Sequence, residues 1–488
     1  MIRIPHLRNP KEFPLNEPPA DAPPAPRLVL ALLPVGALVC FLVGNALIHP
    51  DSEWAPHIPL VLAAAVAACL GIATGTGWKA IENGIIDGIG IGMKAILILC
   101  VIGIMIGTWI ASGIVPVMID YGLRFLDPSY FLVASCLICS VVSVATGSSW
   151  TTAGTIGIAL IGIGQGLGVP LPMTAGAIIS GAYFGDKMSP LSDSTNLAPA
   201  VAGSELFEHI RHMLATTVPG LVIALILYGI LGARGFEGQT STESIEAIRS
   251  ALEASFDLNP VLLIPPLLII VMVIFRLAAL PALLAAALLG ALLAMVIQGT
   301  PLVAIVDVMQ AGYTADTGND TVNELLSRGG LDSMMYTVSL ILCALTFGGV
   351  MERCGFLRAI ASAILSLATS TGSLVTATVA TCFGMNIVAA DQYLSIILPG
   401  RMYQTAYRNR GLHPKNLSRT LEDAGTLTSP FIPWNTCGAF MSQTLTVAPL
   451  AYLPYCFLNL LTPLIAIGLA YAGWSIAKWE GPTTGSDD

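Results

Sequence analysis

The sequence predicts an all-α, multi-pass membrane protein that contains two related blocks of opposite orientation. Hydrophobic residues make up 55% of the chain and charged residues only 10%, whereas a soluble globular domain is about a quarter charged. Apolar runs long enough to cross a bilayer recur along the chain. Polar motifs rich in proline interrupt this pattern at corresponding places in the two halves. Basic clusters with interleaved aromatic residues are absent from the sequence, which argues against nucleic-acid binding.

The first 27 residues are rich in proline and mixed charge, and we expect them to form a disordered cytoplasmic N-terminus. A signal-peptide cleavage site does not follow, so the first apolar run should remain as a helix. The rest of the chain divides into peripheral membrane helices, a first repeat, extracytoplasmic loops with linking helices, a second inverted repeat and a C-terminal tail. These five parts are 28–93, 94–232, 233–334, 335–475 and 476–488.

Ten apolar runs have the length of a membrane span. They lie at about 28–48, 57–77, 94–112, 130–147, 213–232, 261–275, 278–298, 335–351, 372–390 and 450–474. Five shorter apolar pieces carry glycine, proline and polar groups, which favours amphipathic connectors, re-entrant hairpins or broken helices. These pieces lie near 114–127, 153–184, 355–370, 392–405 and 423–447. The glycine series Gly88, Gly90 and Gly92 falls in a predicted loop and favours close helix packing or a hairpin tip over nucleotide binding.

The positions of lysine and arginine predict the orientation of the blocks. The N-terminal segment carries four basic residues, so the N-terminus should be cytoplasmic. The same rule predicts that the chain runs toward the outside through 94–112 and toward the cytoplasm through 335–351.

A weak internal repeat connects these two runs. The segment 106–126 resembles 347–367 in its glycine pattern and apolar face, at an offset of roughly 240. Continuing this offset pairs Ser189-Pro190 with Ser429-Pro430, Asn196 with Thr436 and Thr151 with Asp391. Similar blocks of opposite orientation are characteristic of inverted-repeat secondary transporters, whose site lies near the bilayer midplane where helices are broken.

Two polar segments of the first block supply the oxygen ligands that a hard cation needs. Prolines 190 and 199 predict a helix that stops and restarts. Asp193 is the leading carboxylate because its nearest basic neighbour in the sequence is Lys187. Asp186 lies beside Lys187 and could instead form a helix-end ion pair. The candidate ligands are Thr146, Ser148, Ser149, Thr151, Asp186, Ser192, Asp193, Ser194, Thr195 and Asn196.

The second block repeats this combination of acids, hydroxyls and an amide around prolines. If the two half-sites face one another, they form a single cavity. Thr420 and Asp423 also match a capping box, and Glu422 has basic neighbours that fit a solvated face, so simple structural roles stay open for both acids. The candidates here are Asp391, Glu422, Asp423, Thr426, Ser429, Asn435 and Thr436.

Three motifs resemble the NhaC family of Na⁺/H⁺ antiporters, and the similarity extends over roughly residues 28–475. They are TGSSWTTAGTIG (146–157), GAYFGDKMSPLSDSTNLAPA (181–200) and LEDAGTLTSPFIPWNTCGAFM (421–441). The resemblance implies a multi-pass plasma-membrane protein that exchanges Na⁺ for H⁺, in a family that includes malate and lactate carriers. Ala424 lacks the hydroxyl common at its position in this family, so we exclude it from the ligands.

We therefore expect a secondary antiporter that exchanges Na⁺, with Li⁺ as an alternative cation, for H⁺ by alternating access. Asp193 would hold Na⁺ and H⁺ in turn, and the other acids would carry protons or act in gating. This activity is not enzymatic and needs no cofactor beyond the transported ions.

Two alternatives stay open on the sequence. In the first, a Na⁺- or H⁺-coupled exchanger binds malate, lactate or an amino acid through Lys187, Arg401 or a helix N-terminus. In the second, the chain is a membrane receptor or scaffold that transports nothing. The expected partners are the lipid bilayer and a small ion or carboxylate, with a homodimer as a further possibility.

Overall fold

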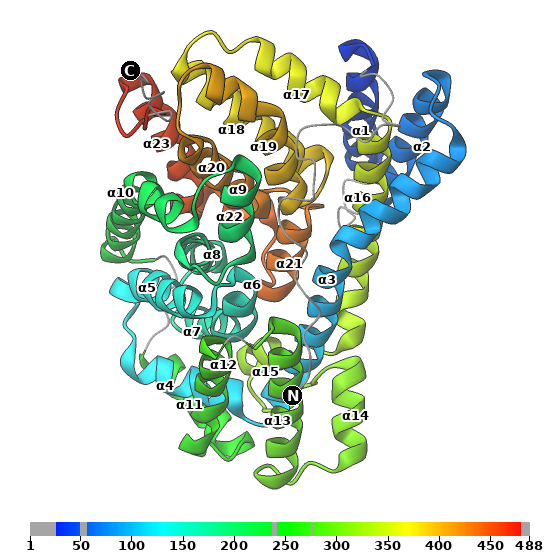
Figure 1. Cartoon of the computed structure of the whole chain (residues 1–488). Coiled ribbons are helices and arrows are strands. Elements are labelled where there is room, and N and C mark those ends of the chain that lie inside the picture. Colours follow the sequence, from blue (N-terminus) through cyan, green and yellow to red (C-terminus); the bar gives the residue numbers. More distant parts are fainter. Residues whose placement is uncertain (1–25, 49–55, 237–241, 276, 480–488) are drawn as a thin grey trace, which may run out of the picture.

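The computed structural model describes residues 26–48, 56–236, 242–275 and 277–479, and the described chain is almost entirely helical (Figure 1). The predicted disordered N-terminus falls outside these residues except for its last two positions, and so does most of the predicted tail. One isolated β-bridge joins Leu412 to Lys478.

The chain begins with α1 (Leu28–Ile48) and α2 (His57–Ala73). A first group of helices comprises α3 (Trp78–Ala111), α4 (Ile114–Phe125), α5 (Pro128–Thr146), α6 (Ser149–Thr152), the π-helical η2 (Ala153–Gly157), α7 (Ile158–Gly166), α8 (Leu171–Met188), α9 (Asp193–Ala202) and α10 (Leu206–Ala233). Linking helices are α11 (Thr242–Ser255), the 3₁₀ turn η3 (Pro260–Leu263), α12 (Ile264–Ile274), α13 (Ala279–Val296), α14 (Leu302–Ala311) and α15 (Asp320–Leu326).

A second group comprises α16 (Leu331–Arg353), α17 (Phe356–Ser366), α18 (Thr371–Val388), α19 (Gln392–Asn409), α20 (Pro414–Leu421), the π-helical η4 (Glu422–Thr426), the 3₁₀ turn η5 (Ser429–Phe431), α21 (Thr436–Leu445), α22 (Pro449–Tyr452), the 3₁₀ turn η6 (Leu453–Tyr455) and α23 (Phe457–Ala472).

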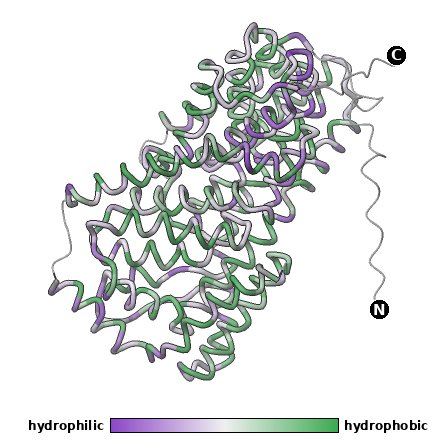
Figure 2. Tube along the Cα trace, turned by 60° about the vertical axis from the view of Figure 1, so that its left-hand side comes forward, coloured by the Kyte–Doolittle hydropathy of each residue, from purple (hydrophilic) through white to green (hydrophobic). Residues whose placement is uncertain are grey.

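Seven of the described helices are long and apolar enough to cross a membrane: α1, α3, α5, α10, α13, α16 and α18. Two further helix pairs pass the same test but are sharply bent, by 105° between α11 and α12 and by 61° between α22 and α23. Hydrophobic residues dominate much of the trace, whereas hydrophilic stretches are densest at its upper right and recur at its lower left (Figure 2). The predicted multi-pass, all-α fold with broken helices is confirmed.

The two groups of helices are copies of one another at a constant spacing. Asp391 caps α19 and stands 243 positions after Ser148, which caps α6; Asn435 caps α21 and stands 243 positions after Ser192, which caps α9. Helices α9 and α21 have equal lengths, and both end at a residue in the left-handed conformation. The repeat is therefore confirmed at a spacing close to the expected one.

The pairing of residues within that repeat needs correction. The helix caps place Pro190 opposite Pro433 and Asp186 opposite Ser429, so the expected pairs Ser189-Pro190 with Ser429-Pro430, Asn196 with Thr436 and Thr151 with Asp391 are wrong by about three positions. The Ser-Pro dipeptides are not structurally equivalent. The first lies in the break between α8 and α9, and the second lies inside η5.

Helices α3 and α16 occupy corresponding places in the two groups and run antiparallel along one another. Gly84, near the start of α3, lies against Arg353 at the end of α16, whereas Gly103 near the end of α3 lies against Gly330 at the start of α16. Each helix is followed by a left-handed glycine and a short amphipathic helix. Corresponding helices of opposite direction establish that the repeat is inverted, as predicted.

Two local predictions are wrong. Helix α3 is continuous from Trp78, so the expected loop before residue 94 is helical. Close packing offsets the low helix propensity of its glycines, since a Cβ at Gly88 would lie 3.0 Å from the carbonyl oxygen of Leu345. Pro199 lies inside α9 and does not break it, whereas Pro190 does lie in the break between α8 and α9.

Candidate functional site

A cavity of about 1170 Å³ lies between the two repeats. Both predicted half-sites line it, so the structure brings them together in one space. Helix α3 and the start of α13 complete the lining. The polar side chains at the wall are Lys94, Thr146, Ser148, Thr151, Asp186, Asp193, Ser194, Asn196, Asp391, Gln392, Tyr393 and Thr436.

Four helices begin beside this cavity, two from each repeat. In α6 and α9, the hydroxyls of Ser148 and Ser192 accept hydrogen bonds from the backbone N–H of Thr151 and Thr195 at 3.1 and 3.4 Å. In α19 and α21, carboxylate and amide oxygens of Asp391 and Asn435 play the same part. The N-termini of four helices thus direct partial positive charge toward one polar centre.

Asp186 is the carboxylate at this centre. It lies in the last turn of α8, is 8% exposed and reaches the cavity wall. Its Oδ2 accepts a hydrogen bond from the Ser149 hydroxyl and its Oδ1 accepts one from the Ser192 hydroxyl, both at 2.6 Å. Among the described residues Asp186 has no ion-pair partner, so the predicted helix-end pair with Lys187 is wrong.

Hydroxyls connect Asp186 to a second buried carboxylate. The Ser192 and Ser194 oxygens lie 3.1 Å apart, and the Ser194 hydroxyl donates to Glu422 Oε1 at 2.8 Å. Glu422 is completely buried, and its other oxygen, Oε2, makes no hydrogen bond to any described residue. The expectation that Glu422 could lie on a solvated face is therefore wrong.

Lys187 turns away from Asp186 and forms a buried ion pair with Asp423. Thr216 also donates to Asp423, at 3.0 Å, and the Arg419 guanidinium lies 3.9 Å from its Oδ2. The capping box predicted at Thr420 and Asp423 is absent, because Thr420 donates to a carbonyl inside α20 and Asp423 continues that helix into η4. Asp423 instead neutralises buried cations.

Asp193, the leading candidate on sequence grounds, differs from Asp186 in both exposure and partner. Its side chain is 59% exposed and pairs with Lys94 on α3, whose Nζ lies 2.5 Å from Asp193 Oδ2. Lys187 is the nearest basic residue to Asp193 in the sequence, but the partner of Asp193 in space is Lys94, 99 positions away. The structure places this acid at the cavity wall as the first residue of α9, where helix N-termini favour acids.

In the second repeat, Asp391 is occupied by helix capping. Its Oδ1 accepts from the backbone N–H of Tyr393 and Leu394 at 2.9 and 3.1 Å, and Oδ2 accepts from the Thr436 hydroxyl at 3.3 Å. Beside it, Gln392 accepts from the Ser429 hydroxyl and the Cys437 thiol. At the cavity wall the second repeat therefore contributes one acid, and both of its oxygens accept hydrogen bonds.

Comparison with known proteins identifies the family. Residues 181–474 match the profile of the Na⁺/H⁺ antiporter family, which covers more than half of the chain. The chain belongs to this family. A relative from Alkalihalophilus pseudofirmus named Na(+)/H(+) antiporter NhaC is 44% identical over 424 residues, covering 87% of this chain and 91% of that protein. The predicted NhaC resemblance is confirmed.

Other relatives in this antiporter family carry different names. A malate-2H(+)/Na(+)-lactate antiporter from Bacillus subtilis is 42% identical, covering 83% of this chain and 86% of that protein. An arginine/ornithine antiporter from Halobacterium salinarum is 38% identical, covering 93% of this chain and 94% of that protein. Family membership thus identifies a membrane antiporter fold more firmly than it identifies the transported ion.

Most of the remaining predicted site residues form hydrogen bonds that hold the broken helices in place. Thr195 ties α9 to α8 by donating to the carbonyls of Asp186 and Lys187, both at 2.9 Å. Asn196 donates to the carbonyls of Pro190 and Ser192 across the break. Asn435 donates to Asn386, whereas the buried Thr426 hydroxyl has no hydrogen-bond partner among the described residues. These polar groups shape the backbone that presents Asp186.

Sequence reasoning missed Lys94 and Tyr393 at the cavity of the antiporter fold, and it left Gln392, which follows Asp391, out of the ligands. Lys94 carried a usable signal, because a single lysine inside the apolar stretch GMKAILIL is costly unless it is paired. Gln392 and Tyr393 gave no comparable signal. Trp150, from the motif 146–157, stacks on Phe440 with ring centroids 4.0 Å apart and so connects the two repeats.

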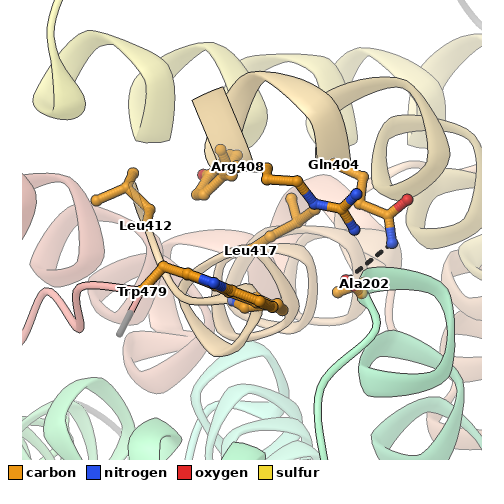
Figure 3. Close-up of a pocket in the computed structure, with 8 residues that line it drawn as sticks. Ala202, Gln404, Arg408, Leu412, Leu417 and Trp479 are labelled. Carbon is orange, nitrogen blue, oxygen red and sulfur yellow. Dashed lines mark hydrogen bonds between the residues drawn. The ribbon is translucent and has the colours of Figure 1, made fainter. Parts of the chain in front are cut away.

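A second, much smaller cavity lies where the C-terminal segment crosses the ends of α19 and α20. Figure 3 shows Trp479 below Leu417 and Gln404 on the other side of the pocket, where its amide donates to the carbonyl of Ala202 at 3.1 Å. Its volume of about 10 Å³ holds roughly one water molecule and no substrate. Nearby, Arg419 on α20 donates to the carbonyl oxygen of Ser475 at 2.8 Å, which holds the C-terminal segment against that helix.

Proposed function

We propose that this chain is a secondary active antiporter that exchanges Na⁺ for H⁺ across the plasma membrane by alternating access. The observation that carries the proposal is Asp186. This buried carboxylate has no counter-ion among the described residues, is surrounded by hydroxyls and opens onto a cavity shared by two inverted repeats. Such an acid favours either a proton or a small cation.

The groups around Asp186 fit a hard monovalent cation, which takes a mixture of charged and neutral oxygens. Ser148 and Thr151 line the cavity close in sequence to Ser149, which already contacts the carboxylate. We assign Na⁺, and Li⁺ as a competing cation, to Asp186 with the hydroxyls of this segment. The activity requires no cofactor, and we retain the cytoplasmic N-terminus as part of the proposal.

Exchange of a small organic ion is the second candidate function. A cavity of about 1170 Å³ far exceeds the space that one Na⁺ needs and is slightly larger than small-molecule sites, which are about 300–1,000 Å³. Four helix N-termini and Lys94 could attract a carboxylate. The names of the malate/lactate and arginine/ornithine relatives support this alternative. We prefer a cation as the transported ion because Asp186 has no counter-ion among the described residues.

Purified protein in liposomes loaded with a pH-sensitive dye separates the two functions. We expect a pulse of NaCl or LiCl alone to move H⁺, while an equal pulse of choline chloride does not. Malate, lactate or a basic amino acid should neither be required nor accelerate the response. If H⁺ movement occurs only when one of these organic ions is added, the Na⁺/H⁺ assignment is wrong and the second function replaces it.

A further inference from the structure

Basic and aromatic side chains gather where α19 ends and the C-terminal segment crosses it. Leu412 forms its β-bridge with Lys478, and the backbone N–H of Trp479 donates to the carbonyl of Gly411 at 2.7 Å. Arg408 and Trp479 line the same small cavity (Figure 3). Four basic residues flank this crossing and form what we call the terminal basic surface: Arg408, Arg410, Lys415 and Lys478.

Most of this positive charge has no partner within the protein. Arg408 and Lys478 are exposed, and Lys415 is half-buried. None of these three side chains forms an ion pair or a hydrogen bond with a described residue. The carboxylate of Glu208 lies at this end of the molecule, but it pairs with the ring of His413, 3.8 Å away. Unpaired cations that lie this close together favour an anionic ligand.

The exposed face of α23 indicates which kind of anion fits. Leu464 and Tyr471 lie about two helical turns apart on this helix, and each is 63% exposed. Trp474 follows the helix and is 71% exposed, and the exposed Lys478 lies further along the chain. An apolar residue, then aromatic residues, then a basic residue is the order expected for a chain that passes from the hydrocarbon core through the interface to the headgroups. The anion therefore belongs to the membrane surface.

The terminal basic surface is predicted to face the cytoplasm, because basic residues concentrate on that side of membrane proteins. Four or more Lys or Arg residues directly beside a membrane helix attract anionic lipids. A lipid phosphate also accepts hydrogen bonds from guanidinium and ammonium groups. We infer that the terminal basic surface binds the headgroups of anionic phospholipids, with Trp474 and Trp479 in the interfacial layer. This lipid site lies outside the transport cavity and goes beyond the proposed function.

Tryptophan fluorescence of the full-length protein in liposomes tests this site. Phosphatidylglycerol with brominated acyl chains should quench Trp474 and Trp479 more than brominated phosphatidylcholine does. We expect a relative affinity about fivefold higher or more, since each basic residue near an anionic surface contributes about that factor. The double variant Trp474→Phe, Trp479→Phe gives the signal of the other tryptophans, which is subtracted. The triple variant Arg408→Gln, Lys415→Gln, Lys478→Gln should lower the relative affinity to about one.

Three basic residues elsewhere on the predicted cytoplasmic side supply a matched control. They are Lys79 at the start of α3, Arg353 at the end of α16 and Arg358 in α17. Changing all three to glutamine removes the same charge, and the relative affinity should stay within about twofold of the wild-type value.

Equal quenching by the two lipids in the wild-type protein overturns the inference, and so does a preference for phosphatidylglycerol that survives in the first triple variant. A preference that the control variant also loses is a general effect of charge and overturns the inference as well. Because the measurement needs no ion transport, its outcome is independent of the proposed Na⁺/H⁺ exchange.

Discussion

The two half-sites have the same backbone geometry but different charges. In both repeats a helix begins at a capped residue beside the cavity, and 44 residues later a second helix does the same. The first repeat caps these helices with Ser148 and Ser192, while the second uses Asp391 and Asn435. The repeat therefore preserves the positions of four helix N-termini and leaves the side chains free to differ.

The free carboxylate illustrates what this difference allows. Asp186 of the first repeat corresponds to Ser429 of the second, where the hydroxyl donates to Gln392 inside the protein. The acid that the second repeat places at the cavity wall, Asp391, has both of its oxygens occupied by hydrogen bonds. One repeat thus supplies an available charge and the other a fixed polar wall. A symmetric backbone can hold an asymmetric site because capping needs only an oxygen acceptor.

The largest difference in transport rate is expected between variants that neutralise Asp186 and variants that neutralise Asp391. Asp186→Asn removes the carboxylate that two serine hydroxyls hold at the cavity wall, and Na⁺-driven H⁺ movement should fall to the level of protein-free liposomes. Asp391→Asn keeps an oxygen that caps α19, and transport should fall less than about threefold. The rates in liposomes check this contrast. Equal losses in the two variants would show that both half-sites bind the transported ion.

The comparison also shows how far sequence reasoning reached. Apolar runs, proline breaks and the repeat were visible because they follow from local composition and spacing. Side-chain partners were not, since Lys187 pairs with Asp423 across 236 positions and Lys94 with Asp193 across 99. Lys187 stands next to Asp186 in the chain, but successive helical residues point in different directions. Tertiary packing therefore determines which of the acids has a cationic partner, and the sequence does not show it.

A smaller, structural effect should follow from filling space beside Asp186. A Cβ on Gly185 would overlap the backbone of Ser143 and Val144, where α8 packs on α5. Gly185→Ala should lower the free energy of unfolding by about 1–3 kcal/mol and reduce transport by displacing the adjacent acid. Thermal unfolding in detergent and the liposome assay measure both changes.

The second repeat offers a matched control for this substitution. Gly384 lies on α18, the helix that corresponds to α5, and a Cβ there would meet no atom within 4 Å. Gly384→Ala should leave transport unchanged and keep or slightly raise stability, because alanine favours a helix by about 0.5–1 kcal/mol over glycine. If both alanine variants are equally stable, packing of α8 on α5 is looser than the structure indicates.

The smallest effects should come from the exposed pair at the cavity wall, Lys94 and Asp193. Neutralising Asp193 should raise the KM for Na⁺ about two- to threefold, and Lys94→Gln should lower it similarly, because each charge alters the potential that the entering cation meets. Both changes should shrink as ionic strength rises, since the Debye length falls to about 8 Å at 0.15 M. The maximal rate should stay unchanged. Should Asp193→Asn abolish exchange while Asp186→Asn retains it, the order of the two acids reverses and the cation ligand is the exposed residue that begins α9.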